Sequence, residues 1–384
     1  MELCYLQAQI DRSAIEHNCR LLKSRASGCR FCVAIKADAY GHGVKVVLPA
    51  MDRAGVDMLA VACIEEASEL RLLGWKGPIL VFGNEFGIYS EKQRQEIAEF
   101  LVENHIRITV TRKQDAEILG LAGEKLNKLV VVHLALDTGM SRMGLSGEDL
   151  WELIEQLGRL PQIQIEGLYT HFATADCVEK SFAKLQLSRF NEFLLKLKRS
   201  GIAIPIIHAA NSGACVDLPE AHFNMVRPGI SVYGYHASGE MHCKPGLRPA
   251  LKLISFFTLV KTIPAGSCVG YGCTFQAKRE TTVGLVPIGY ADGYFRELSN
   301  RGKMIVAEKI VPVIGRVSMD QTILDLTDLT AAKINPQVGD EAVIYDNHRE
   351  SPNSVEKTAE LLGTIPYVVT TSLGNRVKRI GIDS

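Results

Sequence analysis

The feature that most constrains this chain is a regular alternation of short apolar runs with stretches of helical period. Eight apolar, β-rich runs are Phe31–Ile35, Met58–Ala62, Ile79–Phe82, Ile106–Val110, Leu129–Leu136, Ile163–Tyr169, Ile204–His208 and Met225–Val232. Amphipathic stretches between or before them include Ser13–Ser24, Ile64–Leu73, Ser90–Glu103 and Lys180–Arg199. Apolar strands that alternate with helices indicate a parallel sheet whose faces are covered. Eight repeats predict a closed (β/α)₈ barrel over residues 11–237. A doubly wound open sheet is the alternative, but no G-x-G-x-x-G motif follows the first strand.

The pattern changes after a linker-like segment, Ala237–Glu240. Short β-rich runs with turn signals then follow: Ile254–Thr262, Thr282–Pro287, Met304–Val306, Ile310–Val313, Gln321–Asp325 and Glu341–Tyr345. We also expect a helix over Ser354–Leu362 and a final strand-like run through Tyr367. The α/β barrel is therefore followed by a mainly β domain of residues 238–384, and we expect residues 1–10 to add a strand to it.

Composition argues against several classes of protein. The chain carries 43 basic and 43 acidic residues without a basic block, so binding to nucleic acid or to an anionic membrane is not expected. No apolar run approaches the roughly 20 residues of a membrane-spanning helix. The N-terminus lacks the pattern of a signal peptide, which favours a cytoplasmic protein. Ten cysteines then indicate reduced thiols. No metal site is expected.

Polar residues follow the strands where a barrel places its active site, at the carboxyl ends. They include Lys36, Asn84, Asp137, Arg142, His171, Asn211, Ser212, Arg227 and Gly229. A lysine at the mouth of a buried strand either reaches solvent or is reactive. The last two strand ends often hold a phosphate, and Ser212, Gly213 and Gly229 suit one. A lysine and a phosphate cradle together suggest pyridoxal 5′-phosphate, held as a Schiff base.

Eight motifs, in order along the chain, carry a resemblance to a known family. They are Ala34–Gly43 (AIKADAYGHG), Asp137–Gly144 (DTGMSRMG), His171–Asp176 (HFATAD), His208–Gly213 (HAANSG), Arg227–Gly234 (RPGISVYG), Val269–Gly272 (VGYG), Gly289–Gly293 (GYADG) and Gly315–Gln321 (GRVSMDQ). The chain resembles the alanine racemases, pyridoxal phosphate enzymes with a barrel and a β domain. The resemblance implies interconversion of L- and D-alanine, which supplies peptidoglycan synthesis.

The resemblance also implies roles for individual residues. Lys36 would hold the cofactor and act as the base on one face of the substrate. Tyr271 would act on the opposite face, in the active site of a neighbouring subunit, so a homodimer is implied. Arg227 would face the pyridine nitrogen, and His171 would link Arg227 to Tyr271. Two bases on opposite faces explain action on both antipodes.

Further residues would bind the cofactor or the substrate. The cofactor would contact Tyr40, Arg142, His171, Asn211, Ser212, Arg227, Gly229, Ile230 and Tyr367. The small amino-acid substrate would contact Arg142, and also Met319 and Asp320 of the second subunit.

One position departs from the family pattern. Family members often carry a carbamylated lysine two residues before the aspartate of DTGM, where it orients the following arginine; here the residue is Ala135. We expect a bound anion or a neighbouring side chain to position Arg142 instead. Because of this departure, a serine racemase or a broad-specificity racemase of the same family remains an alternative. A pyridoxal phosphate decarboxylase is a further alternative.

Overall fold

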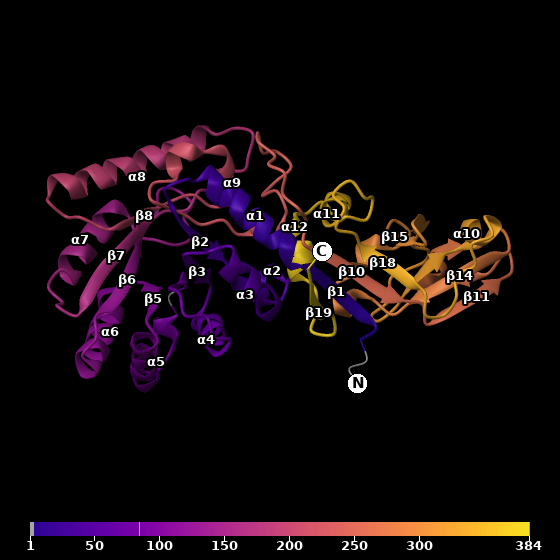
Figure 1. Cartoon of the computed structure of the whole chain (residues 1–384), viewed down its shortest axis with the longest axis horizontal. Coiled ribbons are helices and arrows are strands. Elements are labelled where there is room, and N and C mark those ends of the chain that lie inside the picture. Colours follow the sequence, from indigo (N-terminus) through magenta and orange to yellow (C-terminus); the bar gives the residue numbers. More distant parts are fainter. Residues whose placement is uncertain (1–3, 84, 384) are drawn as a thin grey trace.

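A computed structural model describes residues 4–83 and 85–383 of the chain. Two parts lie side by side along the long axis of the molecule (Figure 1). The indigo-to-magenta part contains the barrel, and the orange-to-yellow part is mainly β. The ends of the described chain both lie near the junction between the two parts.

The first part is a closed barrel of eight parallel strands, in which the first strand pairs with the last. The strands are β2 (Arg30–Ala34), β3 (Met58–Val61), β4 (Ile79–Val81), β5 (Ile106–Thr109), β6 (Val130–Ala135), β7 (Ile163–Tyr169), β8 (Ile206–His208) and β9 (Met225–Val226). The predicted (β/α)₈ barrel is confirmed, and the open sheet is excluded. The eighth run was predicted too long. After β9 the chain continues as Arg227-Pro228, and Ile230–Tyr233 forms a 3₁₀ helix, because proline has no N–H for a strand ladder.

Helices follow most barrel strands. They are α2 (Lys36–Tyr40), α3 (Val44–Arg53), α4 (Ile64–Leu72), α5 (Glu91–Glu103), α6 (Lys113–Leu126), α7 (Gly147–Leu157), α8 (Ser181–Arg199) and α9 (Ser212–Asp217). The helix α1 (Arg12–Arg25) precedes the barrel and buries Ile15, Cys19 and Leu22 on one face. Asp11 caps it by accepting from the Ala14 N–H at 3.0 Å. The four predicted helices are all present, with ends within one residue of those expected.

The second part is built on a six-stranded sheet. Its order is β16 (Lys309–Pro312), β15 (Lys303–Val306), β18 (Glu341–Tyr345), β10 (Leu251–Phe256), β1 (Leu6–Asp11) and β19 (Lys378–Ile382). A three-stranded sheet contains β11 (Leu259–Ile263), β14 (Thr281–Val286) and β17 (Thr322–Asp325), and β12 (Cys268–Val269) pairs with β13 (Phe275–Gln276). The N-terminal strand β1 runs antiparallel to β10 and parallel to β19, so both ends of the chain share one sheet.

Two predictions for the second part were wrong in detail. The run Ile254–Thr262 is not one strand, since β10 ends at Phe256 and β11 begins at Leu259 in another sheet. The run through Tyr367 is a helix, α12 (Pro366–Thr371), that begins at a proline. Proline suits the first turn of a helix, and burial of Val369 overrides the strand preference of β-branched residues. The helix predicted over Ser354–Leu362 is α11 (Val355–Leu362), with Ser354 as its cap; the short α10 (Thr327–Ala331) precedes β18.

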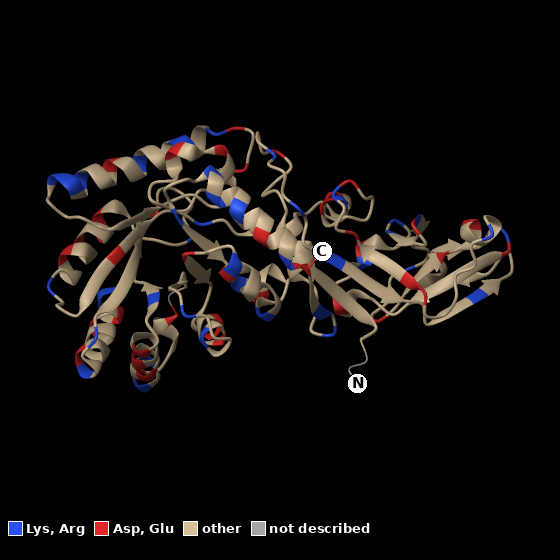
Figure 2. Ribbon diagram, viewed as in Figure 1, with Lys and Arg blue, Asp and Glu red and all other residues tan. Residues whose placement is uncertain are grey.

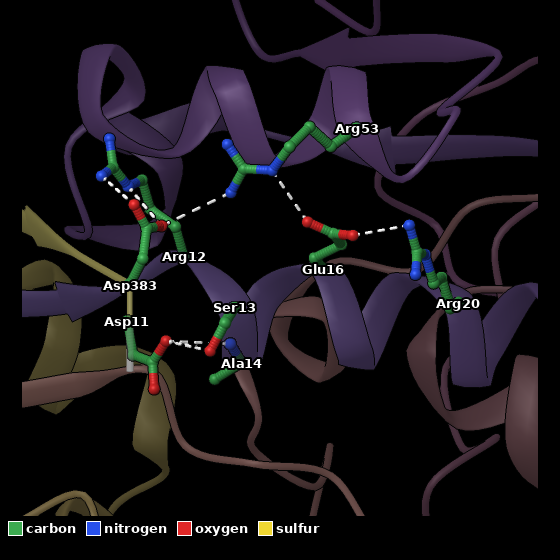
Figure 3. Close-up of polar contacts among 8 residues, drawn as sticks. All are labelled: Asp11, Arg12, Ser13, Ala14, Glu16, Arg20, Arg53 and Asp383. Carbon is green, nitrogen blue, oxygen red and sulfur yellow. Dashed lines mark hydrogen bonds and ion pairs between the residues drawn. The ribbon is translucent and has the colours of Figure 1, made fainter.

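An ion-pair network joins the start of α1 to α3 and to the end of β19 (Figure 3). Arg12 pairs with Asp383, and Arg53 lies 2.8 Å from Glu16 and 3.5 Å from Asp383. Partly exposed pairs of this kind stabilise a fold by at most about 1 kcal/mol each. The direct continuation of β1, a strand of the second part, into α1 is therefore the stronger link between the two parts of the chain.

Basic and acidic residues are interspersed along the helices and strands (Figure 2). Within residues 4–83 and 85–383, the helices are all too short or too polar to cross a membrane.

Candidate active site

A cavity of about 500 Å³ opens at the carboxyl ends of the barrel strands. Its lining includes Ala34, Lys36, Tyr40, Ala62, Phe82, Gly83, Ala135, Leu136, Asp137, Met140, Arg142, Met143, Tyr169, Thr170, His171, Asn211, Ser212, Arg227, Gly229 and Tyr367. Nine of the predicted site residues therefore line one space, although they come from five different βα segments and from α12. A mostly apolar cavity with a few converging polar groups is typical of a small-molecule site.

Lys36 directly follows the first barrel strand and begins an unusual turn. Ala37, Asp38, Ala39 and Tyr40 form a left-handed helical turn with φ between 50° and 56°. The Glu66 carboxylate holds this turn by accepting from the Ala37 N–H at 2.7 Å. Burial, and secondarily the charge of Arg142, lower the pKa of Lys36. A lysine with a lowered pKa can act as a nucleophile or a base near neutral pH.

A cradle of hydrogen-bond donors surrounds Gly229. A Cβ atom at Gly229 would lie 2.3 Å from the Tyr40 hydroxyl, so only glycine leaves room there. Ser212 Oγ accepts from the Gly229 N–H at 2.8 Å, which leaves its own hydroxyl proton free to donate. Burial raises the pKa of Tyr40 and of Tyr367, whose rings lie 5.8 Å apart, so both phenols stay protonated donors. Three hydroxyl donors beside backbone N–H groups fit a phosphate.

Arg227 is 4% exposed and is held rigidly beneath the cavity. Its Nη2 donates to the carbonyl of Thr170 at 2.8 Å, and its Nη1 donates to His208 Nδ1 at 2.9 Å. Burial lowers the pKa of Arg227 to about 10, which leaves it charged at neutral pH.

The contact to His208 begins a chain of hydrogen bonds through the interior of the barrel. His208 Nε2 lies 2.9 Å from His133 Nδ1, and His133 Nε2 lies 3.1 Å from Glu166 Oε2. Arg107 completes the chain at 2.8 Å from the same carboxylate oxygen. A Cβ at Gly167 would lie 2.3 Å from the His133 ring, so this glycine makes space for the chain.

The direction of each hydrogen bond in this series follows from the residues at its two ends, Arg227 and Glu166. Arginine can only donate, so His208 Nδ1 accepts and its Nε2–H donates to His133. The Nε2–H of His133 then donates to Glu166. Burial lowers the pKa of both histidines and so keeps them neutral. Burial opposes ionisation of Glu166, but hydrogen bonds from His133 and Arg107 outweigh it and lower its pKa to about 2.

His171 and Arg142 border the same cavity. Burial, with the nearby charges of Arg227 and Arg142, lowers the pKa of His171 to about 3, so its ring is neutral at physiological pH. Arg142 is exposed and has no hydrogen-bond or ion-pair partner among residues 4–83 and 85–383. Among the described residues, no neighbouring side chain hydrogen-bonds to Arg142 in place of the family's lysine, and the expectation that an anion or a side chain positions Arg142 stays a prediction. Ala135 is buried and leaves only a methyl group in the lining.

The other predicted site residues lie elsewhere. Tyr271 and Met319 are 71% and 53% exposed, and neither lines the cavity. Asp320 is also outside it and pairs with Arg376 at 2.7 Å. Ile230 is fully buried behind Gly229. Asn84 lies outside the described residues.

Sequence reasoning assigned no role to His133, and none to His208 beyond its motif, or to Tyr169, which stacks on the His208 ring at 4.9 Å. A signal was present, since His133 and His208 each stand in an otherwise apolar strand. A polar residue at such a position needs a buried partner.

Comparisons with known proteins agree with this arrangement. A family model described as "Alanine racemase, N-terminal domain" matches residues 10–237, and one for the C-terminal domain matches residues 250–381. An alanine racemase of Methanococcus maripaludis is 40% identical over 97% of this chain and 97% of its own. The structure of an alanine racemase from Streptomyces lavendulae covers 100% of this chain and 98% of its own, with a TM-score of 0.91 and 34% identity. An alanine racemase from Bartonella henselae, solved with covalently bound pyridoxal phosphate, has a TM-score of 0.85 and 31% identity, over 99% of this chain and 100% of its own.

Proposed function

Because this chain belongs to the alanine racemase family, we propose that it interconverts L- and D-alanine with pyridoxal 5′-phosphate as a homodimer in the cytoplasm. The observation that carries the proposal is the convergence of Lys36, the donor cradle around Gly229 and the buried Arg227 on one cavity. D-Alanine made in this way would supply peptidoglycan synthesis.

The residues around the cavity fit the cofactor. Tyr40, Asn211, Ser212, Gly229 and Tyr367, which line the cavity, would hold its phosphate together with Ile230, the residue directly after Gly229, and Lys36 would bind its aldehyde carbon. Arg227 would face the ring nitrogen. An arginine whose other N–H groups already donate to His208 and Thr170 does not hand over a proton, so it leaves that nitrogen unprotonated.

Pyridoxal phosphate supplies an electron-withdrawing system that makes the α-proton of an amino acid acidic. The side chains then move the proton. Lys36 Nζ would take or return it on one face, because burial and Arg142 favour the neutral amine. The Tyr271 hydroxyl of a second copy would serve the other face. Arg142, with Met319 and Asp320 of the second copy, would bind the substrate carboxylate.

The size of the side-chain site favours alanine. Tyr367 borders the cavity of its own chain, and Tyr271 of the second copy would narrow it further. Such a site rejects bulk, but it discriminates weakly against an isostere that adds one hydroxyl. Serine is therefore the competing substrate to measure. No observation favours a decarboxylase.

The first experiment is chiral chromatography after separate incubation of L-alanine and L-serine with the protein and pyridoxal phosphate. We expect rapid formation of D-alanine, slower formation of D-serine, and neither with Lys36→Ala. As a matched control, Lys45→Ala on α3 should retain full activity, since Lys45 is exposed and does not line the cavity. Formation of D-serine faster than D-alanine would support the alternative that the protein is a serine racemase. Absence of both products would contradict the proposal.

A further inference from the structure

Gln186, in α8, is fully buried although glutamine usually lies at the surface. Its side-chain amide makes three hydrogen bonds, each to a residue outside α8. Oε1 accepts from the Ala173 N–H at 2.9 Å, and Nε2 donates to the His171 carbonyl at 3.0 Å and to Thr138 Oγ1 at 3.2 Å. A buried amide with these partners holds two other segments of the chain in place against its own helix.

The orientation of this amide follows from its partners. The Ala173 N–H can only donate and the His171 carbonyl can only accept, so Oε1 faces the first and Nε2 faces the second. The two bonds hold the backbone on both sides of Phe172 and thereby fix the backbone position of His171. Since Gln186 has no exposed surface, a second copy of the chain cannot contact it.

The third bond reaches the segment Asp137–Gly144, which follows β6 and carries Arg142. Arg189 lies three residues after Gln186 on the same face of α8, and its Nη1 donates to the Thr138 carbonyl at 2.8 Å. Helix α8 therefore holds Thr138 through both its hydroxyl and its carbonyl group. Arg142 has no hydrogen-bond or ion-pair partner of its own in the described ranges, so its position depends on the backbone that these contacts hold.

The same bond connects Gln186 to the buried arginine of the cavity. Thr138 Oγ1 accepts from Gln186, so its own proton is free to donate to Thr170 Oγ1 at 2.7 Å. The Thr170 carbonyl in turn accepts from Arg227 Nη2 at 2.8 Å. One amide is thereby joined to the segment after β6, to the segment after β7 and, through Thr170, to Arg227.

We propose that Gln186 is a positioning residue that sets the distance between His171 and the segment carrying Arg142, and so aligns both with the reacting amino acid. This inference rests on the proposed function, in which His171 supports the base Tyr271 of the second copy and Arg142 binds the substrate carboxylate. Loss of the amide would then disturb proton transfer and substrate binding together.

The test compares the full-length protein loaded with pyridoxal phosphate with its Gln186→Met variant. Methionine is nearly as long as glutamine but has no amide, so the Ala173 N–H and the His171 carbonyl lose their partner. We expect kcat for alanine to fall by up to about 100-fold, the effect of a misplacement of about 1 Å, and KM to rise several-fold as Arg142 moves. Partial unfolding alone would lower the apparent kcat and leave KM unchanged.

Amide hydrogen exchange gives a second readout that does not depend on activity. Mass spectrometry of peptic peptides that cover residues 170–176 reports whether the Ala173 N–H is protected. We expect protection in the unaltered protein and faster exchange in Gln186→Met, because the acceptor of this N–H is lost.

Two further variants complete the experiment. Gln95→Met makes the same change at an exposed position of α5 that does not line the cavity, and it should leave kcat, KM and exchange unchanged. Arg189→Met removes the bond to the Thr138 carbonyl alone. It should raise KM with little change in kcat, since Gln186 still holds the backbone at His171.

An unchanged KM in Gln186→Met, or unchanged exchange at Ala173, would overturn the inference. If Gln186→Met does not fold, an unchanged KM in Arg189→Met would show that α8 does not hold the segment carrying Arg142. Failure of the proposed function would appear separately, as inactivity of the unaltered protein, whereas hydrogen exchange tests the contacts of Gln186 in either case.

Discussion

At the scale of single residues, Arg227 lines the cavity but depends on three side chains that do not line it. Arg227 is charged and almost fully buried, and His208, His133 and Glu166 offset the cost of that burial with a one-directional chain of hydrogen bonds. Only the far end of the chain, at Glu166 and Arg107, is partly exposed to water. The chain therefore fixes both the orientation of Arg227 and its charge.

Substitution of His208 by alanine tests this support. His208→Ala leaves Arg227 Nη1 and His133 Nδ1 without partners, so we expect a loss of about 1–3 kcal/mol in the free energy of unfolding. Urea unfolding measures it. Racemisation should slow with little change in KM, because the substrate contacts remain. His242→Ala, at an exposed histidine outside the hydrogen-bond chain, should change stability by less than about 0.5 kcal/mol. Equal stability of the two variants would show that the hydrogen-bond chain does not stabilise the fold.

Buried neutral histidines make the fold sensitive to acid. Burial lowers the pKa of His42 to about 4 and of His171 to about 3, against an ordinary value of 6.5. At a pH between the folded and the unfolded pKa, these histidines bind protons in the unfolded protein but not in the folded protein. The free energy of unfolding therefore falls as the pH drops below 6.5. Each histidine contributes a slope of up to about 1.4 kcal/mol per pH unit.

Urea midpoints between pH 7 and pH 4 measure this slope, and His42→Gln should flatten it. An unchanged slope in the variant would mean that His42 is protonated in the folded protein.

At the scale of elements, sequence periodicity predicted the barrel because each strand and helix carries its own local pattern, as Ile163–Tyr169 and Ser181–Arg199 do. It failed at Pro366–Thr371, and it gave no sign of the left-handed turn at Ala37–Tyr40, because packing decides the backbone at both places. Gly41 illustrates this: a Cβ there would lie 2.0 Å from the Thr370 carbonyl, so α12 pushes directly against the turn after Lys36. Similarly, strand ends indicated which residues surround the cavity, but the hydrogen-bond chain through His133 depends on contacts between strands that are far apart in the sequence.

The left-handed turn after Lys36 stores strain that a glycine would relieve. Ala37 is exposed with φ of 52°, where a Cβ costs about 1–2 kcal/mol, while glycine adds about 0.5–1 kcal/mol of unfolded-state entropy. Ala37→Gly should therefore range from neutral to about 1.5 kcal/mol stabilising. The same change in the right-handed helix α8, Ala183→Gly, should cost about 1 kcal/mol. Thermal or urea unfolding of the two variants measures both changes in stability. Equal losses of stability would contradict the inference that the turn is strained.

At the scale of the whole molecule, one chain carries all the residues of the proposed reaction, but these residues lie in two separate places. Lys36 and Arg227 line the barrel cavity, whereas Tyr271, Met319 and Asp320 lie on the surface of the second part. A symmetric pair of chains, each lending its second part to the other's barrel, would complete two sites.

Mixed dimers test this exchange. Lys36→Ala and Tyr271→Ala should each be inactive alone. When they are unfolded and refolded together, about half of the dimers are mixed, and one of the two sites in each is intact. About a quarter of the normal activity should return, whereas no recovery would place Tyr271 and Lys36 of one site in the same chain.

The position of β1 between β10 and β19 has a consequence for biosynthesis. Gln7 pairs with Lys378, so the first strand to leave the ribosome waits for nearly the last residues before its sheet can close. At about 5–20 residues per second this interval is on the order of tens of seconds. During it, the barrel can form beside α1 and β10 can pair with β1, while the edge of β1 that receives β19 stays unpaired, open to chaperones or to a neighbouring nascent chain. Assembly of the second part is thus timed by translation of its final strand.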